Sequence, residues 1–304
     1  MGKTEHFVSV SEDGKVCIWD ARSVDKNEIK EREKAGKKNS WRPFIPAIQL
    51  TRPDGSGDFG LSRILFHPNQ TTTTFYAGSD EGDLILVDWT VQKAAKPGAQ
   101  SDEHKQENQL IKKIYDSERN YRPVLALERS PFYEDMLMTV HDFHFCLWMT
   151  NKDYDTPIYR SAYTFGSYNT CGAFSPTRPG VIFITKTSGI DIWDFADQSN
   201  RPSTTLNFTS PTTYFKFQQP PADPAQAKGR AQLMAYGDEN LGTLYLLEVH
   251  SNMRQPLDNE KENIESFWAR EMEKCEYVKD RRIAMRADFE TKQKQEDLRK
   301  AREE

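Results

Sequence analysis

Cysteine is scarce in this sequence, and its four cysteines, at positions 17, 146, 171 and 275, form no CxxC pair. This spacing argues against a zinc site and favours reduced thiols in a cytosolic compartment. Long apolar runs are missing as well. No run reaches the roughly 18 residues of a membrane span, and the N-terminus lacks the apolar stretch of a signal peptide. The sequence therefore predicts a soluble intracellular protein.

A strong excess of one charge is also lacking. The formal net charge is −5, which excludes general nucleic-acid binding as an expectation. Hydrophobic residues make up 37% of the chain and charged residues 29%. That mixture is too apolar for wholesale disorder, yet it leaves room for long polar insertions. We expect a folded protein with charged segments between its structured units.

Catalytic motifs are the third absence. The sequence contains no GxGxxG, no P-loop and no HExxH, and no nucleophile has a recognisable base partner. His141 and His144 lie close together, but they fall in a hairpin with no third ligand in sight. We therefore expect no enzyme, no cofactor and no metal. The alternative is a hydrolase whose acids gather near a central channel.

One pattern is present five times: a short alternating strand, a turn, and a second strand that ends in an aromatic or aliphatic residue beside an acid. The copies run from His6 to Arg22, Phe75 to Thr90, Asp135 to Thr150, Val181 to Ala196 and Leu233 to Val249. Turns such as Asp13-Gly14 and Glu81-Gly82 supply residues that tolerate positive φ in tight hairpins. The third copy has no glycine between its strands, which predicts a wider loop there.

Four copies follow another strand that ends in a proline-containing turn. Proline stops a strand because it cannot donate to the next rung of a sheet. These strands are Ser62 to Phe66, Val124 to Leu127, Cys171 to Phe174 and Thr213 to Phe217. Residual strand character at Pro157 to Tyr163 and Ser203 to Phe208 fits a fourth, outer strand. Each unit thus has the make-up of one blade.

The shortest interval between equivalent positions, from Trp148 to Trp193, matches the period of a WD-repeat blade. The predicted fold is all-β: a WD-repeat β-propeller with about five visible blades, the first incomplete, followed by a long C-terminal α-helix. We assign residues 1–250 to the blades, with charged insertions at 23–60 and 91–120, and residues 251–304 to the helical extension. An antiparallel sandwich is the alternative fold. Because this repeat class typically has about seven blades, we expect further blades upstream.

Two segments allow more than one interpretation. The charged stretch from Ser23 to Ser40 is either a loop between blades or a contact with an acidic partner such as tubulin. From Asn259 to Glu304 there is no glycine or proline, and apolar residues recur at three- and four-residue spacing. The first half of that helix either packs back on the last blade or docks a partner protein.

The predicted partner-binding residues fall in inter-strand turns and on the apolar face of the helix. Acids in the turns also serve turn chemistry alone, which is the competing interpretation. The predicted set is Asp142, Phe143, His144, Asp238, Ile264, Phe267, Trp268 and Met272.

Two units resemble a known family. The segment from Glu128 to Val140, followed by Phe145-Cys-Leu-Trp148, resembles a characteristic blade of dynein intermediate chains. The segment from Ser175 to Phe183, followed by Gly189 to Asp194, is similar to the blade that comes next in that family. The resemblance covers roughly Leu61 to Val249, and the charged helix is similar to the C-terminal extension of the axonemal inner-arm member. In the last copy Leu247 replaces the usual tryptophan, which weakens that motif.

The resemblance implies a non-catalytic scaffold: a seven-bladed propeller that grips the tail of a dynein heavy chain beside a second intermediate chain. It also implies dynein light chains bound through an N-terminal segment that this sequence lacks, and anchoring of the motor at the doublet microtubule of a cilium or flagellum. No nucleic acid or membrane partner is implied. The competing function is an unrelated WD-repeat adaptor in the cytoplasm.

Overall fold

The computed structural model describes residues 6–20, 43–52, 56–67, 73–89, 110–115, 122–219 and 231–303. These residues form five antiparallel sheets and a C-terminal helical segment, and strands consecutive in the chain are neighbours within each sheet. The regular strand–turn–strand order is the one that the repeats predict.

The first sheet contains β1 (His6–Val10), β2 (Lys15–Asp20) and β3 (Pro43–Gln49). The second contains β4 (Leu61–Phe66), β5 (Thr74–Ser79), β6 (Leu84–Asp88) and β7 (Ile111–Tyr115). The third contains β8 (Ala126–Arg129), β9 (Met136–Val140), β10 (Phe145–Met149) and β11 (Tyr159–Arg160). The fourth contains β12 (Asn169–Phe174), β13 (Val181–Lys186), β14 (Gly189–Asp194) and β15 (Thr204–Asn207). The fifth contains β16 (Thr212–Phe217), β17 (Leu233–Asp238) and β18 (Leu244–Glu248).

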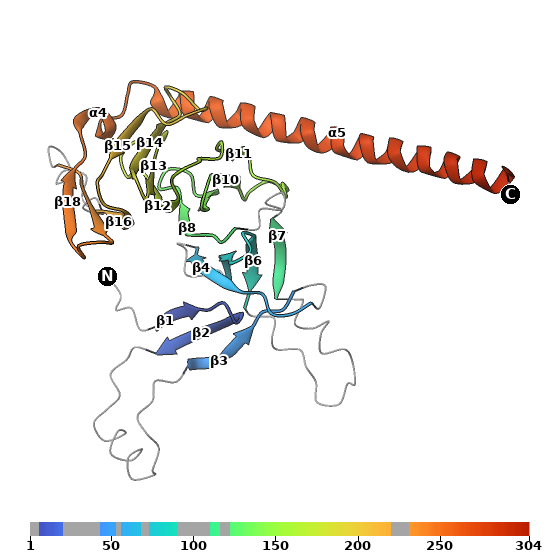
Figure 1. The fold of residues 1–304 in the computed structure, drawn as a ribbon, viewed down its shortest axis with the longest axis horizontal. Helices are drawn as coiled ribbons and strands as arrows, with labels where there is room; N and C mark the ends of the chain where they lie inside the picture. Colours follow the sequence, from blue (N-terminus) through green and yellow to red (C-terminus); the bar gives the residue numbers. More distant parts are fainter. Residues whose placement is uncertain are drawn as a thin grey trace, which may run out of the picture.

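The five sheets follow one another round an arc (Figure 1). The strands that begin successive sheets contact one another, β4 with β8, β8 with β12, and β12 with β16, while β1 contacts β4. Such radial repetition of four-stranded sheets is the architecture of a β-propeller. The predicted fold class is therefore confirmed.

The strands of all five copies lie where the repeats place them, and the predicted outer strands appear as β11 and β15. The expected wider loop in the third hairpin is wrong. Residues 141–144 separate β9 from β10, and residues 11–14 separate β1 from β2, so the two loops have equal length. Gly14 adopts φ 73°, whereas the third hairpin, in which His141 N–H donates to the His144 carbonyl, contains no residue with positive φ.

Two strands fall inside stretches that the sequence analysis treats as insertions. β3 lies within residues 23–60 and β7 within residues 91–120. Each pairs with the second strand of the preceding repeat hairpin, β3 with β2 and β7 with β6. The charged stretch from Ser23 to Ser40, for which a tubulin contact is one interpretation, lies outside the described residues.

Apolar side chains between neighbouring sheets form the core. One cluster joins the first two sheets, a second joins the second sheet to the third, and the largest runs from the third sheet through the fifth. Trp148 of β10 is 1% exposed and packs edge-on against Tyr115 of the preceding sheet, with ring centroids 5.7 Å apart. Trp193 of β14 packs edge-on against Phe145 of the preceding sheet at 5.1 Å. Trp148 and Trp193 thus each fasten their sheet to the one before.

The two end sheets leave apolar side chains uncovered. On the first sheet Phe7, stacked on Trp19, is 48% exposed. On the fifth sheet Leu244 and Leu246 of β18 are 68% and 69% exposed, because they lie on the opposite side from Tyr245 and Leu247, which face the fourth sheet. At each end of the row of sheets, the exposed face is the one on which a further sheet would pack.

After the last strand the chain forms the short helix α4 (Ser251–Arg254) and the long helix α5 (Glu260–Glu303). At 1.5 Å per residue, the 44 residues of α5 extend about 66 Å. The helix crosses the outer side of the sheets and continues well past them (Figure 1). No helix among the described residues is long and apolar enough to cross a membrane.

Candidate interaction surfaces

The third sheet contains a buried polar relay. The Trp148 indole N–H donates to the Thr139 hydroxyl oxygen over 2.9 Å, and His141 Nε2 lies 3.1 Å from that oxygen. His141 Nδ1 lies 3.2 Å from the Arg122 carbonyl, which can only accept, so Nδ1 carries the proton and Nε2 accepts from Thr139. Burial lowers the pKa of His141 to about 4, which keeps the ring neutral. The relay serves to hold the hairpin.

His144 lies against this relay rather than facing solvent. Its ring is 1% exposed and stacks on His141 with centroids 4.8 Å apart, and burial lowers its pKa to about 3. The sequence analysis found no third ligand near this pair, but the fold places Cys146 beside it, with potential ligand atoms all within 4.8 Å of one another. The two rings are nearly parallel, at 8°, so their in-plane lone pairs do not converge, and both nitrogens of His141 are hydrogen-bonded. The cluster fits a packed polar core better than a metal centre.

Around the same hairpin lies a group of aromatic residues, which we call the aromatic rim patch. It consists of the half-buried Phe143 and the exposed Tyr163, Phe165 and Tyr168. Phe143 packs on Tyr168 with centroids 5.2 Å apart, and the Arg122 guanidinium lies 5.3 Å above the Phe143 ring. Phe165 is 91% exposed at the tip of the loop between β11 and β12. That loop crosses the hairpin, since Thr164 N–H donates to the Phe143 carbonyl over 2.8 Å.

Of the four turn residues predicted to bind partners, two lie at this patch and two do not. Phe143 and Asp142 are half-buried at its edge, and Asp142 pairs with Arg122 at 3.7 Å. His144 belongs to the buried relay. Asp238, on the fifth sheet, accepts hydrogen bonds from Ser210 and from the backbone N–H groups of Asn240 and Leu241; the Ser210 bond is the largest cause that holds its pKa below the ordinary value. Asp238 therefore caps a turn.

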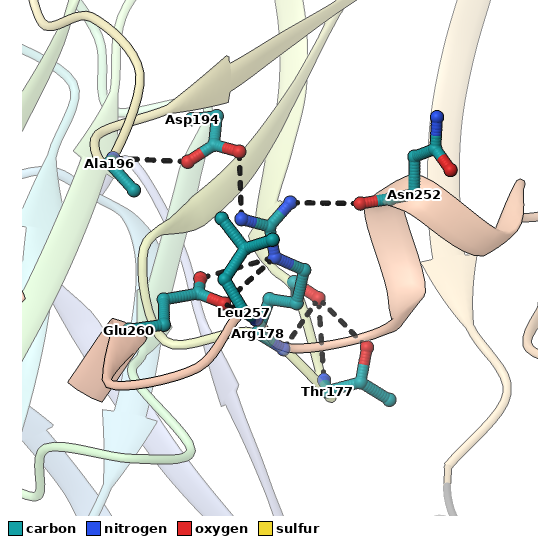
Figure 2. A network of polar contacts seen from close by, with 8 residues as sticks. Thr177, Arg178, Asp194, Ala196, Asn252, Leu257 and Glu260 are labelled. Atoms are coloured by element: carbon teal, nitrogen blue, oxygen red, sulfur yellow. Dashed lines mark hydrogen bonds and ion pairs between the residues drawn. The ribbon is translucent and has the colours of Figure 1, made fainter.

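The start of α5 is held by a buried ionic network (Figure 2). Arg178, in the turn between β12 and β13, is 3% exposed, and its Nε donates to both carboxylate oxygens of Glu260, at 3.1 and 3.0 Å. Its other nitrogens reach the Asp194 carboxylate at 2.8 Å and the Asn252 carbonyl at 3.0 Å. Glu260, 1% exposed at the first helical position, also accepts from Leu257 N–H. One arginine thus ties the fourth sheet, α4 and α5 together.

Apolar packing continues this attachment along the first half of α5. Ile264 and Trp268 are 1% and 3% exposed, and the Trp268 ring lies 5.1 Å from that of Phe195. Gly180 permits the approach, because a Cβ atom there would lie 2.5 Å from Ile264 Cδ1. Farther along, Glu276 accepts from the Tyr154 hydroxyl over 2.7 Å and Lys279 donates to the Asp153 carbonyl over 3.0 Å.

Four residues of the predicted partner site lie on α5, and all four take part in this packing. Ile264 and Trp268 lie in the core, and Phe267 and Met272 are partly buried against it. Their neighbours belong to the fourth and third sheets, so the helix packs on these rather than on the last sheet. The sequence alone did not identify the aromatic rim patch beyond Phe143, although three aromatics within residues 163–168 of a polar loop were the available signal.

The radial sheets and their tryptophan contacts define a WD-repeat β-propeller protein. A family model described as "Dynein axonemal intermediate chain 3 WD40 domain" matches residues 59–249, and the chain belongs to this family of WD-repeat dynein intermediate chains. The resemblance found in the third and fourth repeats is thereby confirmed, whereas the closer match to the inner-arm member, WD repeat-containing protein 63, stays a prediction.

Named relatives agree with this family. Dynein axonemal intermediate chain 3 of Homo sapiens is 29% identical over 227 residues, which cover 73% of this chain and 23% of the human protein. Ciliary dynein intermediate chain 3 of Heliocidaris crassispina is 27% identical and covers 93% of this chain and 40% of its own length. The 70 kDa intermediate chain of the flagellar outer arm of Chlamydomonas reinhardtii is 24% identical, covering 87% and 39%. The chain thus spans less than half the length of these relatives.

Among solved structures, a chain of the COPII outer coat vertex on membranes aligns with a TM-score of 0.50 at 11% identity. The alignment covers 79% of this chain and 57% of that one. At this identity the likeness concerns the fold alone.

Proposed function

We propose that this chain is a non-catalytic scaffold subunit of an axonemal dynein, which binds the heavy-chain tail and helps to anchor the motor on the doublet microtubule. Membership of the intermediate-chain family supports the scaffold role, and the ciliary and flagellar names of the relatives support the axoneme as its location. The conspicuous buried polar groups support a role without catalysis, because Thr139, His141 and Arg178 are each engaged in contacts that hold elements together.

The observation that carries the proposal is the aromatic rim patch. Tyr163, Phe165 and Tyr168 are 50%, 91% and 55% exposed on one rim of the third sheet, beside the arginine at position 122. Aromatic residues and arginine dominate the binding energy of protein interfaces, because they combine large apolar area with polar contacts. We assign the heavy-chain tail to this rim.

The uncovered faces of the end sheets support a larger ring. We propose that residues 1–250 form a sector of a propeller that further sheets complete by covering Phe7 on one side and Leu244 and Leu246 on the other. Residues 251–304 form the helical extension. Light chains would then bind through a region that this sequence does not include, and a second intermediate chain would join the same complex.

Affinity purification tests the scaffold role. A tagged chain expressed in ciliated cells should recover a dynein heavy chain, and replacement of Phe165, which is 91% exposed, by alanine should reduce that recovery at unchanged folding. Phe132→Ala is the matched control, because Phe132 is 36% exposed in the loop between β8 and β9, at the other end of the same sheet. Recovery of no motor subunit at all would refute the proposal, and equal loss in the control would refute the assignment to this rim.

The finer proposal is the inner arm. The C-terminal helix supports it by its likeness to the inner-arm member, whereas one relative carries an outer-arm name. Mass spectrometry of the recovered heavy chain distinguishes the two, since inner-arm and outer-arm heavy chains are different proteins. Recovery of outer-arm heavy chains would exclude the inner-arm assignment.

A further inference from the structure

The second half of α5 has an exposed apolar stripe, which consists of Val278, Met285 and Phe289. Their exposed fractions are 44%, 62% and 67%. Residues spaced by three, four or seven positions share one side of a helix, so these three side chains form a line about 17 Å long. Every described side chain from residue 276 to residue 295 is exposed, so no sheet covers this line.

The stripe continues the face of α5 that is already buried. Ile264, Phe267 and Trp268 lie on that face against the fourth sheet, and Cys275 follows against the third sheet, where its Sγ lies 3.7 Å from the Pro157 carbonyl. Val278 is three residues beyond Cys275. The helix therefore keeps the same apolar side where it continues past the sheets (Figure 1).

The charges around the stripe are arranged by sign. Positions three or four residues from a stripe residue lie beside it, and positions two residues away lie toward the opposite side. Asp280 lies toward the opposite side, and among residues 276–295 Asp288 is the one acid beside the stripe. The basic residues beside the stripe are Arg281, Arg282, Arg286 and Lys292.

We propose that this stripe docks an amphipathic helix of a partner protein whose apolar line is flanked by acidic residues. Helix-on-helix packing suits a straight stripe of spaced apolar side chains, and the basic border selects an acidic one. A second copy of this chain is disfavoured because it would bring a second basic border against the first. The inference is independent of the heavy-chain contact at the aromatic rim patch, which lies on the third sheet.

The experiment uses the full chain and a fluorescent synthetic helix with leucines at every a and d position and glutamates at e and g. Fluorescence anisotropy should show binding that weakens at least about tenfold with Met285→Gln plus Phe289→Gln, as expected for two interface anchors. Tyr277→Gln plus Ile283→Gln is the matched control, since these residues are 64% and 58% exposed off the stripe, and it should change affinity less than about twofold. All four side chains are exposed, so circular dichroism should show the same helicity in both variants.

Charge reversal separates an acidic partner from other occupants. Arg281→Glu plus Arg286→Glu should abolish binding of the glutamate helix and create binding of the same helix with lysines at e and g. Equal affinity of the unmodified chain for both helices, or no binding of either, would overturn the proposal. Sedimentation that shows a dimer lost in the Met285/Phe289 variant would assign the stripe to a second copy, and selective binding to anionic phospholipid vesicles would assign it to a lipid surface. Either result also overturns it.

Discussion

The buried ion pair at the start of α5 allows a quantitative test. Three variants are compared: Arg178→Met, Glu260→Met and the double substitution. The two side chains are 3% and 1% exposed, so either charge left alone would be shut away from water. Loss of one partner of a buried pair costs about 3–5 kcal/mol, whereas replacing both by apolar groups is often close to neutral.

The network makes the two single variants unequal. Arg178→Met leaves two carboxylates, Glu260 and Asp194, without their cation, so we expect a loss near the upper end, about 4–5 kcal/mol. Glu260→Met leaves Arg178 paired with Asp194 at 2.8 Å, which places the loss at about 3 kcal/mol. The double variant should lose about 1–2 kcal/mol, so its loss is smaller than that of either single variant.

The assay combines urea unfolding with hydrogen exchange of residues 260–279, because the helix can detach without global unfolding. Lys216→Met serves as a control: it breaks the Lys216–Glu128 pair, in which Lys216 is 56% exposed, and should cost under about 1 kcal/mol. Additive losses in the double variant, or a loss under about 1 kcal/mol for Arg178→Met, would refute the assignment of a buried, coupled lock.

Three further outcomes are expected. Trp268→Ala should lower the free energy of unfolding by about 3–5 kcal/mol, measured by calorimetry. Trp268→Phe should lower it by under about 1.5 kcal/mol, because the buried indole N–H has no hydrogen-bond partner among the described residues. Equal losses in the two variants would contradict this. Gly180→Ala should cost about 1–3 kcal/mol and speed hydrogen exchange in residues 260–268, since the new Cβ meets Ile264; unchanged exchange would show that the helix is not seated there. The unfolded chain protonates His141 below a pH of about 6.5, but the folded protein does so only near 4, so His141 should lower the free energy of unfolding by about 3 kcal/mol as the pH drops through this window. The stacked His144, whose pKa burial lowers to about 3, adds a loss of the same sign. His141→Gln should therefore reduce the slope in urea titrations without removing it, and an unaltered slope would rule out the His141 contribution.

Repetition explains why the sheets could be predicted from the sequence. A hairpin such as β13–β14 is a local structure, with alternating Ile and Phe side chains and a glycine at position 189, so the sequence pattern and the fold carry the same information. Strands β3 and β7 were harder for different reasons. β3 contains two prolines, at positions 43 and 46, and proline within a run argues against a strand. β7 is an outer strand that gains less from burial, and its sequence is correspondingly polar. Ile111 and Ile114 are only half-buried, and lysines stand between them.

Contacts between distant segments explain what could not be predicted. Nothing local marks Arg178 as the partner of Glu260, since 82 residues separate them and each looks like an ordinary surface charge. The stacking of His141 on His144 was equally hidden. Hairpin residues are usually exposed, but here the loop of residues 161–168 covers the His144 ring through Tyr163, and the Arg122 carbonyl contacts His141. The periodicity of α5 correctly gave one apolar face. It could not show where along that face the sheets end.

That boundary decides which residues on α5 are available to a partner. A continuous apolar face predicts partner contact at its aromatic part, Phe267 and Trp268, since those residues are the ones most favoured at interfaces. In the fold the blades offer these residues an apolar surface, and Phe195 contacts both rings. The weaker apolar residues farther along, Met285 and Phe289, are then the ones left exposed. Arg178 and Glu260 fix the start of the helix, and its direction past the sheets is fixed as well. The ion pair at one end of α5 therefore determines where the exposed stripe at the other end lies.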